Sequence, residues 1–161
     1  MGLDMYLYAV KVEYKSKYYS CPKNTMLTLD YPAPLDFVKN FCDPSVSVRH
    51  SYKIAYWRKA NAIHKYFVDL YDSVDDCRPI EVDFADLENL VKLCEEVLND
   101  HSKAEELLPT QDGFFFGDTE YNKWYFEDID LTIQMLKPAI KAIKELRKNG
   151  EEWYIEYQAS W

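Results

Sequence analysis

Aromatic, amide, imidazole and basic side chains are concentrated in one segment near the middle of the sequence, residues 56–65. Apolar residues recur there at helical spacing, which predicts a helix over residues 51–71. One side of this helix would present Trp57, Arg58, Asn61, His64 and Lys65. An aromatic ring stacks on a planar base, and Arg makes forked hydrogen bonds to an anion. We therefore predict that this face binds a small, planar, anionic ligand. The alternative is that Trp57 and His64 lie at the edge of the core, with solvated basic residues beside them.

A second segment, residues 109–121, combines glycines, phenylalanines and acids. Gly113 and Gly117 bracket three consecutive phenylalanines, which cannot all point the same way in an extended chain. We expect at least one of them to emerge and to line a pocket or an interface. The residues of this segment that we assign to the site are Gln111, Asp112 and Phe115. The alternative is a buried strand followed by a turn that carries polar side chains. The segment lacks the sequence pattern of a phosphate-binding loop.

A third segment begins at Trp124, and we assign Trp124 and Tyr125 to the site as a further aromatic wall. Three carboxylates follow, those of Glu127, Asp128 and Asp130, and these could bind a divalent cation or act as acid and base. Because they fall in the first turns of a predicted helix, a favourable interaction with the helix dipole is the simpler explanation. We predict no metal site and no cofactor.

Known catalytic patterns are absent from the sequence, including G-x-S-x-G, H-E-x-x-H and the zinc deaminase signature. His64 is the best placed of the three histidines for proton transfer, but we assign no catalytic residue. The four cysteines are far apart, and this spacing argues against a zinc site or a redox dithiol. We interpret them as structural thiols in a reducing cytosol.

The length of 161 residues, 48% of them apolar, is typical of one domain with its own core. Acidic residues exceed basic ones by 28 − 19 = 9, and this excess disfavours direct binding of nucleic acid or of an anionic membrane. No apolar run approaches the ~20 residues that span a bilayer, and the first residues lack the regions of a signal peptide. We expect a cytoplasmic protein with no membrane partner.

The apolar pattern predicts strands at both ends of the chain and helices between them. The predicted strands cover residues 3–12 and 153–158, and the predicted longer helices cover 51–71, a stretch from Asp83, and 124–149. Residues 102–105 have the form of a capping box that opens a short helix. We expect residues 13–48 to be mostly irregular with short extended pieces, and residues 36–41 to form one or two helical turns. These elements most simply form one α+β domain, in which about three helices cover a small sheet that contains both termini.

Five stretches spread over nearly the whole chain carry a resemblance: residues 1–7 (MGLDMYL), 56–65 (YWRKANAIHK), 108–117 (LPTQDGFFFG), 124–128 (WYFED) and 157–161 (YQASW). In these stretches the chain resembles a family of small, largely uncharacterised proteins encoded by bacteriophages and prophages. The resemblance implies a phage protein in the cytoplasm of a bacterial host, and it carries over no catalytic residue. Small phage proteins often act against host defence, by capturing a nucleotide signal or by blocking a host protein.

Three hypotheses follow. The first is a non-enzymatic binding protein, with a site for a nucleotide or a nucleotide-derived signal. The second is an acidic inhibitor that imitates DNA or occupies a basic groove of a host protein. Its acidic surface would include Asp72, Asp75, Asp76, Asp83, Asp86, Glu95 and Glu96. The third is an enzyme that acts on a nucleotide-like substrate with His64 as acid or base. The sequence predicts no oligomeric state.

Overall fold

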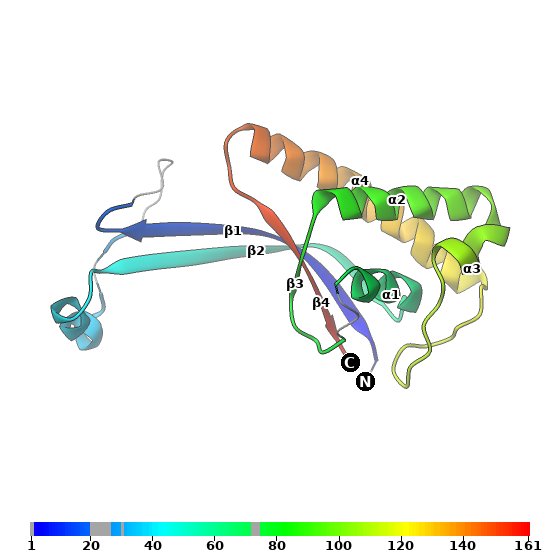
Figure 1. The fold of residues 1–161 in the computed structure, drawn as a ribbon, viewed down its shortest axis with the longest axis horizontal. Helices are drawn as coiled ribbons and strands as arrows, with labels where there is room; N and C mark the ends of the chain where they lie inside the picture. The colour runs from blue at the N-terminus through cyan, green and yellow to red at the C-terminus, as the bar shows by residue number, and fades with distance from the viewer. Residues whose placement is uncertain (1, 20–26, 30, 72–74) are drawn as a thin grey trace. The chain divides into compact units, whose positions relative to one another are not determined.

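The structure is a computed structural model that describes residues 2–19, 27–29, 31–71 and 75–161. Its strands are β1 (Asp4–Ser16), β2 (Ser45–Arg58), β3 (Ile80–Val82) and β4 (Tyr154–Ser160). Its helices are the 3₁₀ helices η1 (Ala33–Asn40) and η2 (His101–Lys103) and the α-helices α1 (Asn61–Leu70), α2 (Phe84–Asn99), α3 (Ala104–Leu107) and α4 (Lys123–Lys148). These elements confirm the α+β class (Figure 1). Contacts divide the chain into two compact units, unit 1 (residues 1–9 and 52–161) and unit 2 (residues 10–51).

The four strands form one antiparallel sheet in the order β2-β1-β4-β3. The strands nearest the two termini, β1 and β4, are neighbours, so the prediction of a sheet containing both chain ends is confirmed. Strand β3 was not predicted, because three residues are too short to show an alternating pattern. It pairs with β4 through Ile80 opposite Tyr157 and Val82 opposite Ile155.

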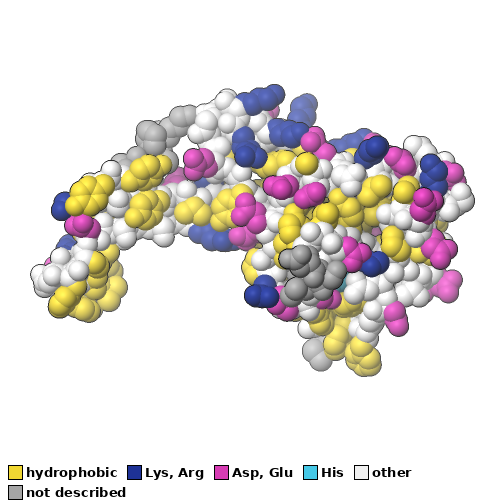
Figure 2. All heavy atoms as spheres, viewed as in Figure 1, with side chains coloured by type: hydrophobic (Ala, Val, Ile, Leu, Met, Phe, Trp, Pro, Cys, Tyr) yellow, Lys and Arg dark blue, Asp and Glu magenta, His cyan; other side chains and the backbone are white. Residues whose placement is uncertain are grey.

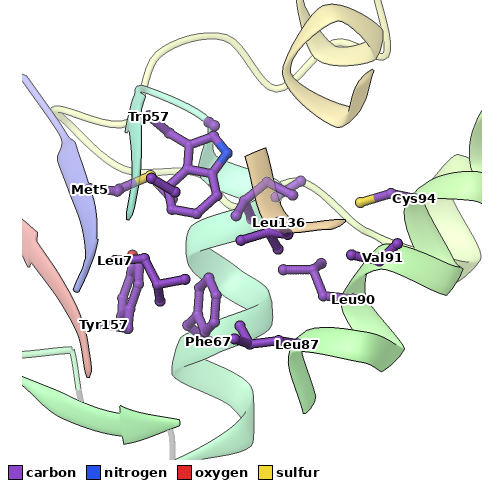
Figure 3. Close-up of a cluster of buried hydrophobic side chains, with 14 of the residues drawn as sticks. Met5, Leu7, Trp57, Phe67, Leu87, Leu90, Val91, Cys94, Leu136 and Tyr157 are labelled. Carbon is purple, nitrogen blue, oxygen red and sulfur yellow. The ribbon is translucent and has the colours of Figure 1, made fainter. Parts of the chain in front are cut away.

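Unit 1 has one hydrophobic core, between the sheet and helices α1, α2 and α4 (Figure 1). Alternate residues of β1 point into it, and β4 contributes the buried Tyr157. Figure 3 shows Met5 and Leu7 of β1 facing Phe67 of α1 and Leu136 of α4. The predicted stripe of α2 is confirmed, with Leu87, Leu90, Val91, Cys94 and Val97 buried. Cys94 is therefore a core residue, and burial raises the pKa of its thiol to about 12.

The predicted helix over residues 51–71 is wrong in its first half, where β2 continues to Arg58. Ala55 and Trp57 are buried and Tyr56 and Arg58 are exposed, which is the alternation of a strand with one covered face. The apolar residues that suggested one helix belong to two elements, the end of β2 and the start of α1, and their spacing matches a helical period by chance. Only α1, which begins at Asn61, has the predicted form.

Helix α4 begins one residue before its predicted start and has a side-chain cap. Asn122 Oδ1 accepts hydrogen bonds from the backbone N–H groups of Trp124 (2.9 Å) and Tyr125 (3.3 Å). The predicted stop at Gly150 is confirmed, since this glycine has a φ of 80° and its N–H bonds to the carbonyl of Arg147.

The other two predicted caps differ in detail. Asp83 does precede α2, but its side chain makes no capping hydrogen bond. The predicted capping box of Ser102 is wrong, because the acceptor is Asp100, whose side chain accepts a hydrogen bond from the backbone N–H of Ser102 at 3.1 Å at the start of η2.

Among the described residues, no helix combines the length and apolar composition that crossing a bilayer requires.

Unit 2 contains residues 10–16 of β1, the helix η1 and residues 45–51 of β2. The prediction that residues 13–48 are mostly irregular with short extended pieces is confirmed for the described residues, since only 13–16 of β1 and 45–48 of β2 are strand in this range. Within unit 2, Lys17 forms an ion pair with Asp43 at 3.2 Å, and the Tyr31 hydroxyl donates to the Ser45 carbonyl at 3.1 Å.

Candidate functional site

Lys59 lies in the turn between β2 and α1, and its backbone has a φ of 60°. The left-handed conformation costs a non-glycine residue roughly 1–2 kcal/mol, so surrounding structure has to fix it. The Lys59 N–H donates to the carbonyl of Leu3 at 2.8 Å. Its side chain passes two glycines: an added Cβ would lie 3.2 Å from Lys59 Cε at Gly2 and 3.2 Å from Lys59 Cβ at Gly117. These two glycines make room for the Lys59 side chain.

Asn61 joins the start of α1 to the loop of residues 109–121. Its Nδ2 group donates to the carbonyls of Phe116 (3.2 Å) and Asp118 (2.8 Å), and its Oδ1 atom accepts the backbone N–H of Gln111 (3.2 Å). The two segments that the sequence singled out therefore do meet in space. Because Asn61 is buried and both ends of its amide are occupied, it positions the loop and has little capacity left for a ligand.

A cleft of about 320 Å³ lies where the turn after β2, this loop and the first turns of α4 come together. Arg58 and Lys59 line it from one element, and Asp118, Glu120 and Asp128 line it from the others. Trp124 also lines the cleft, with 70% of its surface exposed. The cleft thus combines basic, acidic and aromatic side chains within unit 1.

The charged side chains that line this cleft differ in whether they have partners. Among the described residues, no ion pair or side-chain hydrogen bond joins the Arg58 guanidinium or the Lys59 ammonium to a neighbour. By contrast, Asp118 accepts hydrogen bonds from Asn122 Nδ2 at 2.6 Å and from the N–H of Glu120 at 3.0 Å. The cations are therefore available to an anion that enters the cleft.

Asp128 is a partly buried carboxyl group in the same cleft. Burial raises its pKa to about 6, and the negative charge of Glu127 adds to the increase. Glu127 itself forms an ion pair with Lys123 at 3.2 Å. Asp128 thus changes between a hydrogen-bond donor and an acceptor close to neutral pH.

The expected outward face of Trp57 and His64 is wrong, because each has only 1% of its surface exposed. Trp57 lies on the covered face of β2, where its Nε1 donates to Thr132 Oγ1 at 2.8 Å. His64 is enclosed between Tyr157 Oη, 2.6 Å from Nδ1, and Asp75 Oδ2, 3.1 Å from Nε2. These side chains are satisfied core residues, deeper than the edge-of-core alternative supposed.

Tyr157, His64 and Asp75 form a hydrogen-bonded chain. Burial raises the pKa of Tyr157 well above its ordinary value, so the phenol keeps its proton, and we assign it as the donor to His64 Nδ1. In the histidine tautomer that accepts this hydrogen bond, Nε2 carries the ring proton and donates to Asp75. Both ring nitrogens are used within the protein, and the ring edge packs against Phe116 and Trp161.

The remaining predicted site residues lie outside the cleft. Lys65 pairs with Asp69 at 2.7 Å and lines a smaller hollow of about 200 Å³ beside α3. Gln111, Asp112 and Phe115 are not among the residues that line the cleft. The expectation that one phenylalanine emerges is confirmed, but the exposed one is Phe114, at 96%. The segment is a turn and not a buried strand, since the N–H of Phe116 bonds to the carbonyl of Gly113.

Of the ten predicted residues, four line the cleft: Arg58, Asn61, Trp124 and Tyr125. The predicted site lacks five charged residues that line the cleft: Lys59, Asp118, Glu120, Glu127 and Asp128. Lys59 belongs to the basic residues of segment 56–65, but its place in the cleft depends on a backbone conformation that residue types do not show. In the sequence, Asp128 is one of three acids at a predicted helix start, and nothing there distinguishes it from Glu127 and Asp130.

No group of three or more His, Cys, Asp and Glu side chains is arranged to hold a metal ion in the part of the chain that the structure describes. Comparisons with protein-family models, with curated proteins and with solved structures found no match. What the fold and the site define is thus an α+β protein with a cleft of mixed charge. The resemblance to phage proteins stays an expectation from the sequence, since no match bears on it.

Proposed function

We propose that the protein binds a small, planar, anionic ligand, such as a nucleotide or a nucleotide-derived signal, in the cleft lined by Arg58, Lys59, Trp124 and Asp128. The observation that carries this proposal is the presence of two cations without a described acidic partner in a protein whose net charge is −9.

Each part of a nucleotide has a suitable counterpart in the cleft. The forked Arg58 guanidinium and the Lys59 ammonium suit a phosphate group. The exposed Trp124 ring offers a stacking surface for a base, and the Asp128 carboxylate accepts N–H groups from a base edge. The volume of about 320 Å³ is at the lower end of the usual range for small-molecule sites, so it favours a mononucleotide-sized group.

The hypothesis of an acidic inhibitor is less well supported, because most of the carboxylates it needs are engaged within the chain. Asp75 bonds to His64, Asp76 pairs with Arg78, Asp86 accepts from Tyr71, Glu95 pairs with Lys137, and Glu96 pairs with Lys92. Asp72 lies outside the described residues, and Asp83 is exposed. Such pairs partly neutralise the field that would imitate DNA.

The hypothesis of an enzyme that uses His64 is also less well supported. A general acid or base has to come within hydrogen-bond reach of the substrate. His64 is enclosed, and both of its nitrogens already have partners. We therefore propose binding without turnover, and the phage resemblance suggests that capture of a host signal is the purpose of that binding.

The first experiment is native mass spectrometry of protein purified from bacteria, followed by thermal-shift measurements with nucleoside monophosphates, cyclic mono- and dinucleotides, and inorganic phosphate. The proposal expects a retained small molecule, or an increase in melting temperature with at least one nucleotide. Absence of both effects contradicts it. Phosphate alone should bind more weakly, since it cannot stack on Trp124.

Variants then test the location of the site. Arg58→Ala and Trp124→Ala should each weaken binding of the active nucleotide at least tenfold without lowering the melting temperature, because both side chains are exposed. Lys65→Ala is the matched control, since Lys65 is a partly exposed cation on α1 that does not line the cleft. Equal losses in all three variants would place the ligand elsewhere.

A further inference from the structure

Unit 2 has almost no hydrophobic interior. Among its described residues only Val10 is buried, and the 3₁₀ helix η1 contains no buried residue. Ordering the backbone costs roughly 1–2 kcal/mol per residue, and a two-stranded hairpin by itself is marginally stable in water. The apolar side chains of this unit are therefore available to compensate that cost by binding another surface.

Exposed apolar side chains are concentrated on and around η1. Phe37 and Phe41 have 58% and 83% of their surface exposed. Leu35, Tyr18 and Tyr19 of the same unit are also exposed. Figure 2 shows hydrophobic side chains gathered over η1. A group of exposed apolar side chains such as that over η1 indicates an interaction site.

Charge indicates the kind of surface that this unit fits. Unit 2 contains six basic residues (Lys11, Lys15, Lys17, Lys23, Lys39 and Arg49) and four acidic ones (Glu13, Asp30, Asp36 and Asp43), a net charge of 6 − 4 = +2. The rest of the chain then has 19 − 6 = 13 basic and 28 − 4 = 24 acidic residues, a net charge of −11. A partner that complements unit 2 carries net negative charge, and unit 1 of the same protein, at −11, is such a partner.

We propose that unit 2 docks through Leu35, Phe37 and Phe41 on unit 1 of a second copy of this chain. The exchange is reciprocal, so that two copies form a closed dimer with two-fold symmetry. Burial of the aromatic side chains supplies most of the attraction, and the opposite net charges steer the two units together. This inference does not depend on the ligand proposed above.

Sedimentation equilibrium of the purified full-length chain tests the dimer. We expect a particle of twice the chain mass at tens of micromolar protein, with a dissociation constant that rises at least tenfold between 50 mM and 500 mM salt, because screening weakens the attraction between the oppositely charged units. A monomer at all concentrations up to 200 µM in low salt overturns the proposal and leaves a different acidic partner as the occupant. Open-ended aggregates also overturn it, since reciprocal exchange closes at two copies.

Variants locate the contact. Phe37→Ser with Phe41→Ser should raise the dissociation constant at least 100-fold, since two buried phenylalanines are removed. Lys17→Glu should weaken the dimer, whereas Lys92→Glu, the same charge reversal on α2 of unit 1, should not. Far-UV circular dichroism checks that each variant keeps its fold. Dimers of unchanged strength in the double Phe variant contradict the proposed contact.

Discussion

The substitution Asp128→Asn tests the account of the cleft through stability. Burial raises the pKa of the Asp128 carboxyl from its ordinary value near 3.8 to about 6. A folded-state pKa above the unfolded-state value means that the folded protein holds the proton more tightly. Ionisation of Asp128 therefore destabilises the fold, and this loss develops as the pH rises from about 4 to about 6. The isosteric amide removes the charge and with it the loss.

The magnitude follows from the same two values. The difference between 3.8 and about 6 corresponds to roughly 3 kcal/mol, at about 1.4 kcal/mol per pKa unit. Because part of the carboxyl remains in contact with water, solvent screening reduces the expected gain to about 1–2 kcal/mol. We expect Asp128→Asn to raise the free energy of unfolding by this amount above pH 7 and to leave it nearly unchanged at pH 3.5.

Urea denaturation between pH 3.5 and 8 measures this difference directly. Asp130→Asn is the matched control, because Asp130 is an exposed carboxylate on the same helix and its variant should show no such pH dependence. A stability gain that is the same at every pH, or a loss at pH 7, would refute the reasoning. An increase in the free energy of unfolding in Asp128→Asn also agrees with a binding site, because side chains that are positioned for a ligand commonly lower the stability of the fold.

Three further substitutions test the surroundings of the cleft. Asn61→Ala should lower the free energy of unfolding by at least about 2 kcal/mol, because it leaves buried backbone groups without partners, and limited proteolysis should then cut within residues 109–121. Gly117→Ala should cost about 1–2 kcal/mol in urea denaturation, since its φ is 89° and the new Cβ would lie 3.2 Å from Lys59 Cβ; no loss would show that the turn adapts. Tyr157→Phe should cost about 1–2 kcal/mol in the same assay, since the buried His64 Nδ1 loses its donor; an unchanged midpoint would contradict the assigned hydrogen-bond order.

The sequence predicts those parts of the fold whose apolar pattern is long and follows one period. Helices α2 and α4 extend over several turns, and the stop at Gly150 needs only a positive φ. The boundary between β2 and α1 could not be predicted in this way. Only Lys59 and Ala60 separate the strand from the helix, so the alternation of Ala55 and Trp57 merges with the helical spacing of Ile63 and Phe67.

The candidate site is predictable only in part, for a related reason. Residue types predict ligand-binding roles for Arg58 and Trp124, and the structure places both in the lining of the cleft; the binding roles themselves stay a prediction. Which side of an element a residue occupies depends on whether that element is a strand or a helix, so the error at residues 51–58 also misplaced Trp57. The contribution of Lys59 depends on its left-handed backbone and on room left by Gly2 and Gly117, which only the tertiary structure provides.

Isothermal titration calorimetry at pH 7 tests the central claim most directly, with the most strongly stabilising nucleotide of the thermal-shift panel. The wild-type chain is compared with the double variant Arg58→Ala, Lys59→Gly, in which glycine suits the φ of 60° and preserves the turn. We predict saturable binding by the wild type and an affinity at least 100-fold lower for the variant, since two charge-assisted contacts are removed. Equal affinities for the two proteins, or no heat of binding with any nucleotide, would contradict the assignment of this cleft as the binding site.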